Sequence, residues 1–160
     1  MRISLFAATA AVALTLTTAG VALATAALPK ARALAIMHDR HEGMEAIGKA
    51  FKRLHRELDA SSPNLRAIRA SAHTIAALSV KASGWFPRGT GPELGKTGAK
   101  PGIWQNPGDF ASKLRDFQTE AKAFNTAASG TDLTLIRTQS GDLGQTCKSC
   151  HDKYRSEMHH

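Results

Sequence analysis

The sequence predicts an all-α protein, an antiparallel up-down-up-down four-helix bundle. Apolar residues recur at spacings of three and four in four separate segments, as they do in helices that bury one face. Three polar or irregular connections separate these segments, and the sequence has neither an internal repeat nor a strand pattern. Four amphipathic helices joined in this way favour a bundle whose ligand site lies between the helices.

The first two helices are expected at residues 32–58 and 65–81. The apolar stripe of the first has Arg40 in the gap after Met37, and it continues through Met44, Ile47, Phe51, Leu54 and Leu58. The segment Ser61-Ser62-Pro63-Asn64 has the composition of a turn that ends in helix-capping residues. The second helix is expected to point its own stripe inward, namely Leu65, Ile68, Ala72, Ile75 and Leu78.

Residues 84–106 differ in kind from the rest of the chain. This stretch holds three prolines and six glycines, which remove backbone donors and weaken helices, so we expect no regular element in it. A connection of this length in a small domain is usually functional or disordered. Because it also carries Trp85, Phe86, Ile103 and Trp104, we expect a loop that packs on the rest of the protein.

The third and fourth helices complete the pattern. Asn106-Pro107 supplies an N-cap and an N1 proline, and an apolar stripe follows through Phe110, Leu114, Phe117, Ala121 and Phe124. The composition of residues 129–132 is typical of a turn that ends in the N-cap of the next helix. The last helix is expected from about Leu133 to Glu157, loosened at Ser140-Gly141, with an inner stripe of Leu143, Cys147, Cys150, Tyr154 and Met158.

The N-terminus is typical of a secretory signal peptide. One basic residue, Arg2, precedes an apolar Ala- and Thr-rich run, and small residues in A-x-A arrangement predict cleavage between Ala24 and Ala27. We therefore divide the chain into a signal peptide, 1–26, and one bundle domain, 27–160. A membrane anchor is the alternative, which the Thr content and the small-residue end disfavour. In a bacterium, export would place a domain with no further membrane span in the periplasm.

The charge of the chain indicates some classes of partner and disfavours another. Without Arg2, 20 Lys and Arg residues stand against 13 Asp and Glu residues. A surface with this balance can attract acidic partners or membrane headgroups, although many of the charges simply keep a helix face solvated. Nucleic acid is not expected, because the chain is exported and has no motif that reads bases.

The segment Cys147-Lys148-Ser149-Cys150-His151 contains both cysteines of the protein. C-x-x-C-H is the attachment pattern of c-type haem. On a helix these three side chains share a face within one turn, so two thiols can bond the haem vinyl groups while the imidazole binds the iron. The sequence therefore predicts one covalent haem c near the C-terminal helix.

Three other interpretations of the two cysteines are weaker. A disulfide between them would close a very small loop and leave His151 without a role. A thioredoxin-like redox pair requires a βαβ setting, which is absent from the pattern. A zinc site requires four ligands, and the nearby candidates are His159 and His160 at the end of the chain.

The set of motifs resembles the class II c-type cytochromes, the cytochrome c′ family. Besides the C-terminal C-x-x-C-H, Arg40-His41-Glu42-Gly43-Met44 resembles the family's R-Q-x-x-M segment on the first helix. Residues 85–90 resemble its F-P-x-G-S/T turn, and residues 96–104 resemble its T-E-A-K-x-x-I-W loop. The resemblance covers the mature chain in order and spacing, and it implies a four-helix bundle with covalent haem.

The resemblance also implies roles by position. Cys147 and Cys150 would carry the haem, and His151 would be the proximal iron ligand. Further residues would lie around the haem: Arg40 and His41 at its edge, with Arg40 pairing a propionate, Thr97, Gly98 and Trp104 along it, and Arg155 near the proximal imidazole. Two of these depart from the family pattern, since His41 stands in place of Gln and Gly98 in place of Glu.

Two of these positions have alternatives that rest on the residues alone. Arg40 lies on an apolar stripe, and a buried cation requires an anion such as a propionate. It can instead extend its charged end into solvent at the end of the bundle. For His41, the alternative is an ordinary surface histidine without a functional role.

Met44 leaves the coordination of the iron open. If its sulfur binds the iron, Met/His ligation gives a six-coordinate low-spin electron carrier. If Met44 only packs over the haem, the iron is five-coordinate and its buried sixth site can take NO or CO. We favour the five-coordinate form, because the loop motifs resemble cytochrome c′.

The function expected from the sequence is electron transfer by a periplasmic monohaem cytochrome with a hidden site for NO or CO. The alternative from another class is an NO-binding or NO-buffering protein without a redox partner. A peroxidase-like enzyme is disfavoured, because the first helix offers only His41 for distal acid–base chemistry. The redox partner stays unidentified, and the resemblance makes a homodimer plausible.

Overall fold

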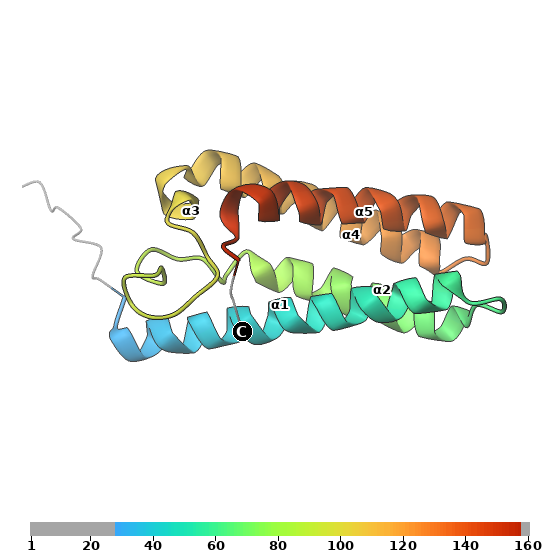
Figure 1. Ribbon diagram of the computed structural model, residues 1–160, viewed down its shortest axis with the longest axis horizontal. Coiled ribbons are helices and arrows are strands. Elements are labelled where there is room, and N and C mark those ends of the chain that lie inside the picture. The colour runs from blue at the N-terminus through green and yellow to red at the C-terminus, as the bar shows by residue number, and fades with distance from the viewer. Residues whose placement is uncertain (1–27, 158–160) are drawn as a thin grey trace, which may run out of the picture.

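The computed structural model describes residues 28–157, which form four long helices and one short one (Figure 1). The long helices are α1 (Lys30–Asp59), α2 (Leu65–Ala82), α4 (Pro107–Ala128) and α5 (Leu133–Tyr154), and the short one is α3 (Gly102–Gln105). Consecutive long helices run in opposite directions, so the predicted up-down-up-down bundle is confirmed. The predicted signal peptide and the terminal histidines lie outside the described residues.

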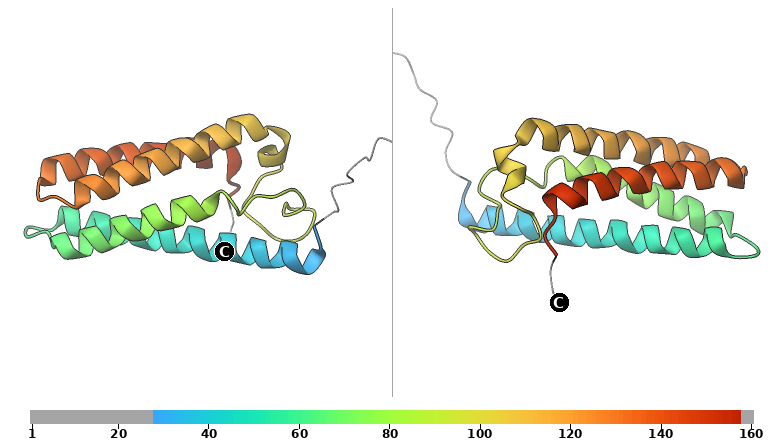
Figure 2. Two further views of the ribbon diagram at one scale, coloured as in Figure 1. Left: turned by 180° about the vertical axis from the view of Figure 1, so that it is seen from behind. Right: turned by 45° about the horizontal axis from the view of Figure 1, so that its top comes forward.

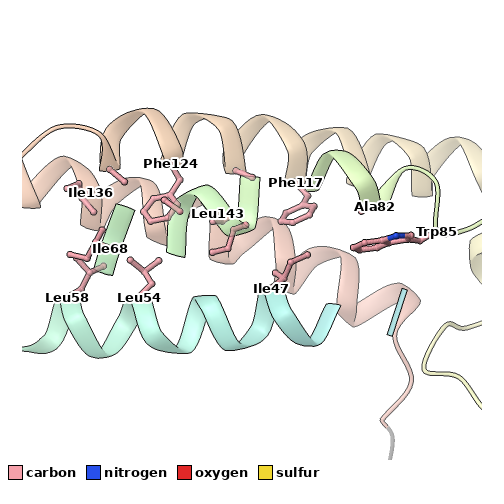
Figure 3. Close-up of a cluster of buried hydrophobic side chains, with 14 residues drawn as sticks. Ile47, Leu54, Leu58, Ile68, Ala82, Trp85, Phe117, Phe124, Ile136 and Leu143 are labelled. Atoms are coloured by element: carbon pink, nitrogen blue, oxygen red, sulfur yellow. The ribbon is translucent and has the colours of Figure 1, made fainter. Parts of the chain in front are cut away.

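The core of the bundle is formed by the predicted apolar stripes (Figure 3). Side chains from all four long helices point into one cluster, where Leu54, Ile68 and Phe124 are completely buried. Met44 and Phe51 belong to the stripe of α1 but are only half-buried, and each packs against the edge of this cluster. A second, smaller cluster of Ala99, Ile103, Phe110 and Tyr154 lies where the C-terminal end of α5 meets the start of α4.

The long helices do not pack equally around the bundle. Helix α1 packs closely along α2, α2 along α4, and α4 along α5, but within residues 28–157 α1 and α5 have no comparable backbone packing. These two helices nevertheless face each other across the remaining side of the bundle (Figures 1 and 2). The Phe51 side chain of α1 reaches α5 on this side: a Cβ added at Gly144 of α5 would lie 3.5 Å from its Cζ.

The helix termini follow the predicted caps with one exception. The Asn64 side chain accepts a hydrogen bond from Ala67 N, and the Asp132 carboxylate accepts from Thr134 N and Leu135 N. Pro107 is the first residue of α4 as expected, but the Asn106 side chain donates to the carbonyl of Gly102 and caps no amide of α4. Asn106 thus fastens the end of α3 to the start of α4.

Three expectations about regular structure were wrong. Residues 102–105 form α3, because the fixed backbone angle of Pro101 sits at its N-cap and allows one helical turn to close. Helix α5 continues unbroken through Ser140-Gly141, since packing of Ile136 and Leu143 on either side holds it in the core, and it ends at Tyr154 rather than Glu157. None of the helices within residues 28–157 is both long and apolar enough to cross a bilayer.

Candidate haem-attachment site

The three residues of the C-x-x-C-H motif lie in the last two turns of α5. Both cysteines are free and half-buried; Cys147 packs against the main core and Cys150 against the smaller cluster. Burial raises the pKa of both thiols, which therefore remain protonated at neutral pH. The pKa of His151 is lowered, first by desolvation and then by the charge of Arg155, and this favours the neutral imidazole that binds metals.

The charge of Arg155 acts on His151, although the Arg155 side chain is exposed. Its backbone pairs with Ala99 in an isolated antiparallel bridge. On either side of this bridge, Lys100 N donates to Tyr154 O and Ser156 N donates to Gly98 O, each at 2.9 Å. The chain immediately after His151 is therefore fastened to the connection between α2 and α4.

Tyr154 anchors the same end of α5 through its side chain. Its ring is buried edge-on against Phe110, and its hydroxyl donates to the carboxylate of Asp109 in the first turn of α4. Lys153 donates to the same carboxylate at 3.0 Å, and these two hydrogen bonds lower the pKa of Asp109. The sequence placed Tyr154 on the inner stripe, but Asp109 had no signal beyond its acidic charge in a first helical turn.

Arg40 is buried inside the bundle end, as expected from its place on the apolar stripe; with 5% of its surface exposed, the alternative of a charged end extended into solvent is wrong. Its guanidinium donates to the carbonyls of Trp85 and Thr90 at 3.1 and 2.9 Å, and to the hydroxyls of Thr90 and Thr97 at 3.3 and 3.0 Å. The rings of Phe86 and Trp104 lie 5.2 and 6.0 Å from its central carbon. Arg40 thus gathers the connection between α2 and α4 around one cation.

All four hydrogen-bond acceptors of Arg40 are neutral oxygens. Burial lowers the pKa of its guanidinium, and the negative charge of Glu93 opposes this effect without forming an ion pair within residues 28–157. A buried cation is costly unless an anion compensates it. The carboxylates of haem c have the charge that this site lacks, so the donor set fits the cofactor.

The remaining predicted site residues divide into two groups. Thr97, Gly98 and Trp104 lie in the connection between α2 and α4. The Thr97 hydroxyl accepts from Arg40, and the Gly98 carbonyl accepts from Ser156 N. The Trp104 indole N–H donates to the carbonyls of Phe86 and Pro87.

The second group lies on α1. Met44 lies one turn after Arg40 and is half-buried. His41 is exposed and faces Glu45 at 3.6 Å, so the structure does not bring it into the buried site.

Gly43 is a buried part of this site that the sequence analysis did not single out. A Cβ at this position would overlap the indole of Trp85, so the helix backbone and the indole are in direct contact. Glycine in the middle of a helix is the available signal, because it weakens the helix and needs a packing reason. Thr90, the buried partner of Arg40, was also missed.

We expect Gly43→Ala to destabilise the protein by about 1–3 kcal/mol, because the added methyl group overlaps the indole of Trp85. Gly48→Ala on the same helix is the matched control, since a Cβ there meets nothing within 4 Å. It should be neutral or stabilising by about 0.5–1 kcal/mol through helix propensity. Denaturant unfolding measures both, and equal stability of the two variants would contradict the contact.

The site fits covalent haem better than the alternatives. Two free thiols and an imidazole lie at one end of α5, on the side that faces α1 without close backbone packing. The buried guanidinium of Arg40 lies at the same end of the bundle. Cys147, Cys150 and His151 would hold the group. Within residues 28–157, no group of three or more His, Cys, Asp or Glu side chains is placed to hold a metal ion, and the terminal histidines of the zinc interpretation lie outside these residues.

Sequence comparisons point to one family. The family model for cytochrome c′ matches residues 35–155. A cytochrome c-554 from Cereibacter sphaeroides is 40% identical over 89 residues, which make up 55% of this chain and 66% of that protein. The match to a second cytochrome c-554 from the same species covers 58% of that second protein. The chain thus spans less than two thirds of the length of either relative, 66% of one and 58% of the other. A cytochrome c′ from Alcaligenes xylosoxydans xylosoxydans is 31% identical over 74% of this chain and 91% of its own.

Solved structures give the same answer. The cytochrome c′ of Thermochromatium tepidum superposes with a TM-score of 0.73 at 28% identity, over 78% of this chain and 97% of its own. A nitric oxide complex of a variant cytochrome c′ from Alcaligenes xylosoxidans gives 0.70 at 27% identity, with the same coverage. A cytochrome c′ with ligand-controlled dimer dissociation gives 0.72 at 28% identity, again with the same coverage.

The four-helix bundle, the Cys-Cys-His set on its last helix and these matches lead to one conclusion. The chain belongs to the cytochrome c′ family, whose members carry a covalently attached haem c.

Proposed function

We propose that this protein is a periplasmic monohaem cytochrome that transfers electrons, with His151 as the axial ligand and a buried distal site that takes NO or CO. When bound, haem c supplies an iron that exchanges one electron and can hold a diatomic ligand. The observation that carries the proposal is the placement of both thiols and His151 on α5, on the side of the bundle where α5 faces α1 without close backbone packing (Figure 1).

The residues of the chain perform three tasks in this proposal. Cys147 and Cys150 fix the cofactor, and the neutral imidazole of His151 binds the iron. Arg40 compensates a propionate charge from its buried position. Met44 and the surrounding apolar side chains restrict the distal face to small uncharged ligands, because a buried apolar surface disfavours hydroxide and other solvated ions.

Two observations favour an open distal site. Met44 packs against the main core cluster rather than standing free, so its side chain already has apolar partners. A variant of a similar cytochrome c′ has been solved as a nitric oxide complex. The alternative is a six-coordinate electron carrier in which the Met44 sulfur binds the iron. The 40% identity to a relative named cytochrome c-554, rather than cytochrome c′, is the observation that favours this alternative.

The visible spectrum of the ferric and ferrous holoprotein, with and without CO or NO, tests the proposal. We expect a high-spin spectrum and a new ferrous species on addition of either gas. A ferrous low-spin spectrum indifferent to CO would overturn the open site and favour Met44 as a ligand. In that case Met44→Ala should produce a high-spin form that binds CO, whereas Met37→Ala, a buried methionine two turns earlier on α1, should not.

We further propose an acidic redox partner, a periplasmic location and a homodimer. The excess of basic residues supports an acidic redox partner, and the N-terminal signal pattern supports export to the periplasm. A homodimer is consistent with the dimer behaviour described for a similar cytochrome c′. We propose no enzymatic activity, because the exposed His41 is the only distal acid–base candidate that the sequence offered.

A further inference from the structure

A path of hydrogen bonds joins α1 to α5 through the connection between α2 and α4. Arg40 of α1 donates to the Thr97 hydroxyl at 3.0 Å, and the same hydroxyl accepts from Ala99 N at 3.2 Å. Gly98 and Lys100, on either side of Ala99, pair with Ser156 and Tyr154 at the end of α5. The Thr97 hydroxyl is therefore the point where the hydrogen bonds of α1 meet those of α5.

This path crosses the one side of the bundle that close backbone packing does not hold together. The other neighbouring helices are held along their length, whereas α1 and α5 have no comparable packing within the described residues. At the opposite end of the bundle a different arginine, Arg69 of α2, donates to Ala128 O and Gly130 O before α5 begins. That link does not involve α1, so the path through Thr97 is placed to set the separation of α1 and α5.

The two ends of the path lie within one helical turn of the residues assigned to the two sides of the iron. Arg40 is four residues before Met44 and on the same face of α1, and Tyr154 is three residues after His151 on α5. A change in the path would thus be transmitted through rigid helix backbone to both positions. A connection without these hydrogen bonds would not transmit a change in this way, because it would be bonded neither to α1 nor to the end of α5.

We infer that the path from Arg40 through Thr97 to residues 98–100 sets the distance between Met44 and His151, and thereby controls access to the distal side of the iron. Thr97 is then a positioning residue, which acts through α1 and α5 without binding the ligand itself. The inference rests on the proposed function. Thr97 is a cleaner target than Arg40, because Arg40 is also proposed to compensate a propionate.

Thr97→Val is the test, because it keeps the shape of the side chain and removes the hydroxyl that Arg40 and Ala99 share. The matched control is Thr90→Val: the Thr90 hydroxyl also accepts from Arg40, but it donates to Pro87 O and has no link to α5. Thr97→Ser, which retains the hydroxyl, should restore the wild-type behaviour. All four holoproteins are compared by the rate of CO binding to the ferrous form, by visible spectrum and by thermal unfolding.

We expect Thr97→Val to change the CO association rate on the order of three- to tenfold, which corresponds to one or two lost hydrogen bonds. Thr90→Val should lower the melting temperature, since Thr90 is completely buried, and should change the CO rate by much less than Thr97→Val does, because Thr90 has no link to α5. Equal CO rates and spectra in Thr97→Val and the wild type would overturn the inference. So would an equal change in both valine variants.

Failure of the proposed function gives a different result. If the wild-type ferrous protein does not bind CO, the open distal site is wrong, but the inference still predicts that Thr97→Val weakens the Met44–iron bond and admits CO. If Thr97→Val does not fold, amide hydrogen exchange of the wild-type holoprotein tests the hydrogen-bond path instead. The amides of Ala99, Lys100 and Ser156 should exchange slowly, and exchange of all three at the rate of free peptide would overturn the path.

Discussion

Replacement of both Cys147 and Cys150 with serine is expected to give a chain from which acidified organic solvent removes all haem after denaturation. The wild-type chain should keep all of its haem under the same treatment. The physical reason is that these two half-buried thiols are the only cysteines of the sequence, and serine cannot form a thioether with a vinyl group. Absorbance of the polypeptide fraction after extraction measures the effect.

The single variants and a neighbouring control make this prediction specific. Each single cysteine variant should retain haem through one bond, with a shifted absorption band in alkaline pyridine because one vinyl group remains unreacted. Ser149→Ala, between the two cysteines on the exposed side of α5, should behave as wild type. Haem retained by the double variant would show that another residue forms the bond, and the assignment of α5 would be wrong.

Replacement of His151 with alanine should leave haem attached but abolish the native iron spectrum almost completely. The thioether bonds do not depend on the imidazole, whereas the ligand field of the iron does. Desolvation lowers the pKa of His151, so the group that is removed is a neutral imidazole rather than a cation. Added free imidazole should then restore much of the wild-type spectrum, and a visible titration measures this recovery.

His73→Ala is the control for the loss of a histidine. His73 is exposed on α2, far in sequence from the motif, and its replacement should change neither the spectrum nor its response to imidazole. A His151→Ala protein with an unchanged spectrum would mean that a different side chain binds the iron.

Much of this site could be predicted from local sequence. The C-x-x-C-H spacing fixes which side chains share a helical turn, and the four apolar stripes fix which face each long helix buries. The caps at Asn64 and Asp132 were predictable for the same reason, since each side chain bonds amides only two or three residues away.

Long-range contacts could not be predicted in this way. Arg40 bonds residues 45 to 57 positions away, and no local pattern indicated that its partners would be two threonine hydroxyls and two carbonyls rather than a carboxylate. The contact of Gly43 with Trp85 is of the same kind, because its cause lies in a different segment. Asn106 was assigned a cap that its side chain does not make, since the carbonyl of α3 competes for it.

The sequence by itself therefore determined the helical elements and the attachment chemistry, both of which depend on residues within one or two turns of each other. Only the tertiary structure decided how the connection between α2 and α4 folds around Arg40 and fastens α1 to the end of α5. The reason is physical: a buried hydrogen-bonding group must find a partner, but which partner it finds depends on how the whole chain packs.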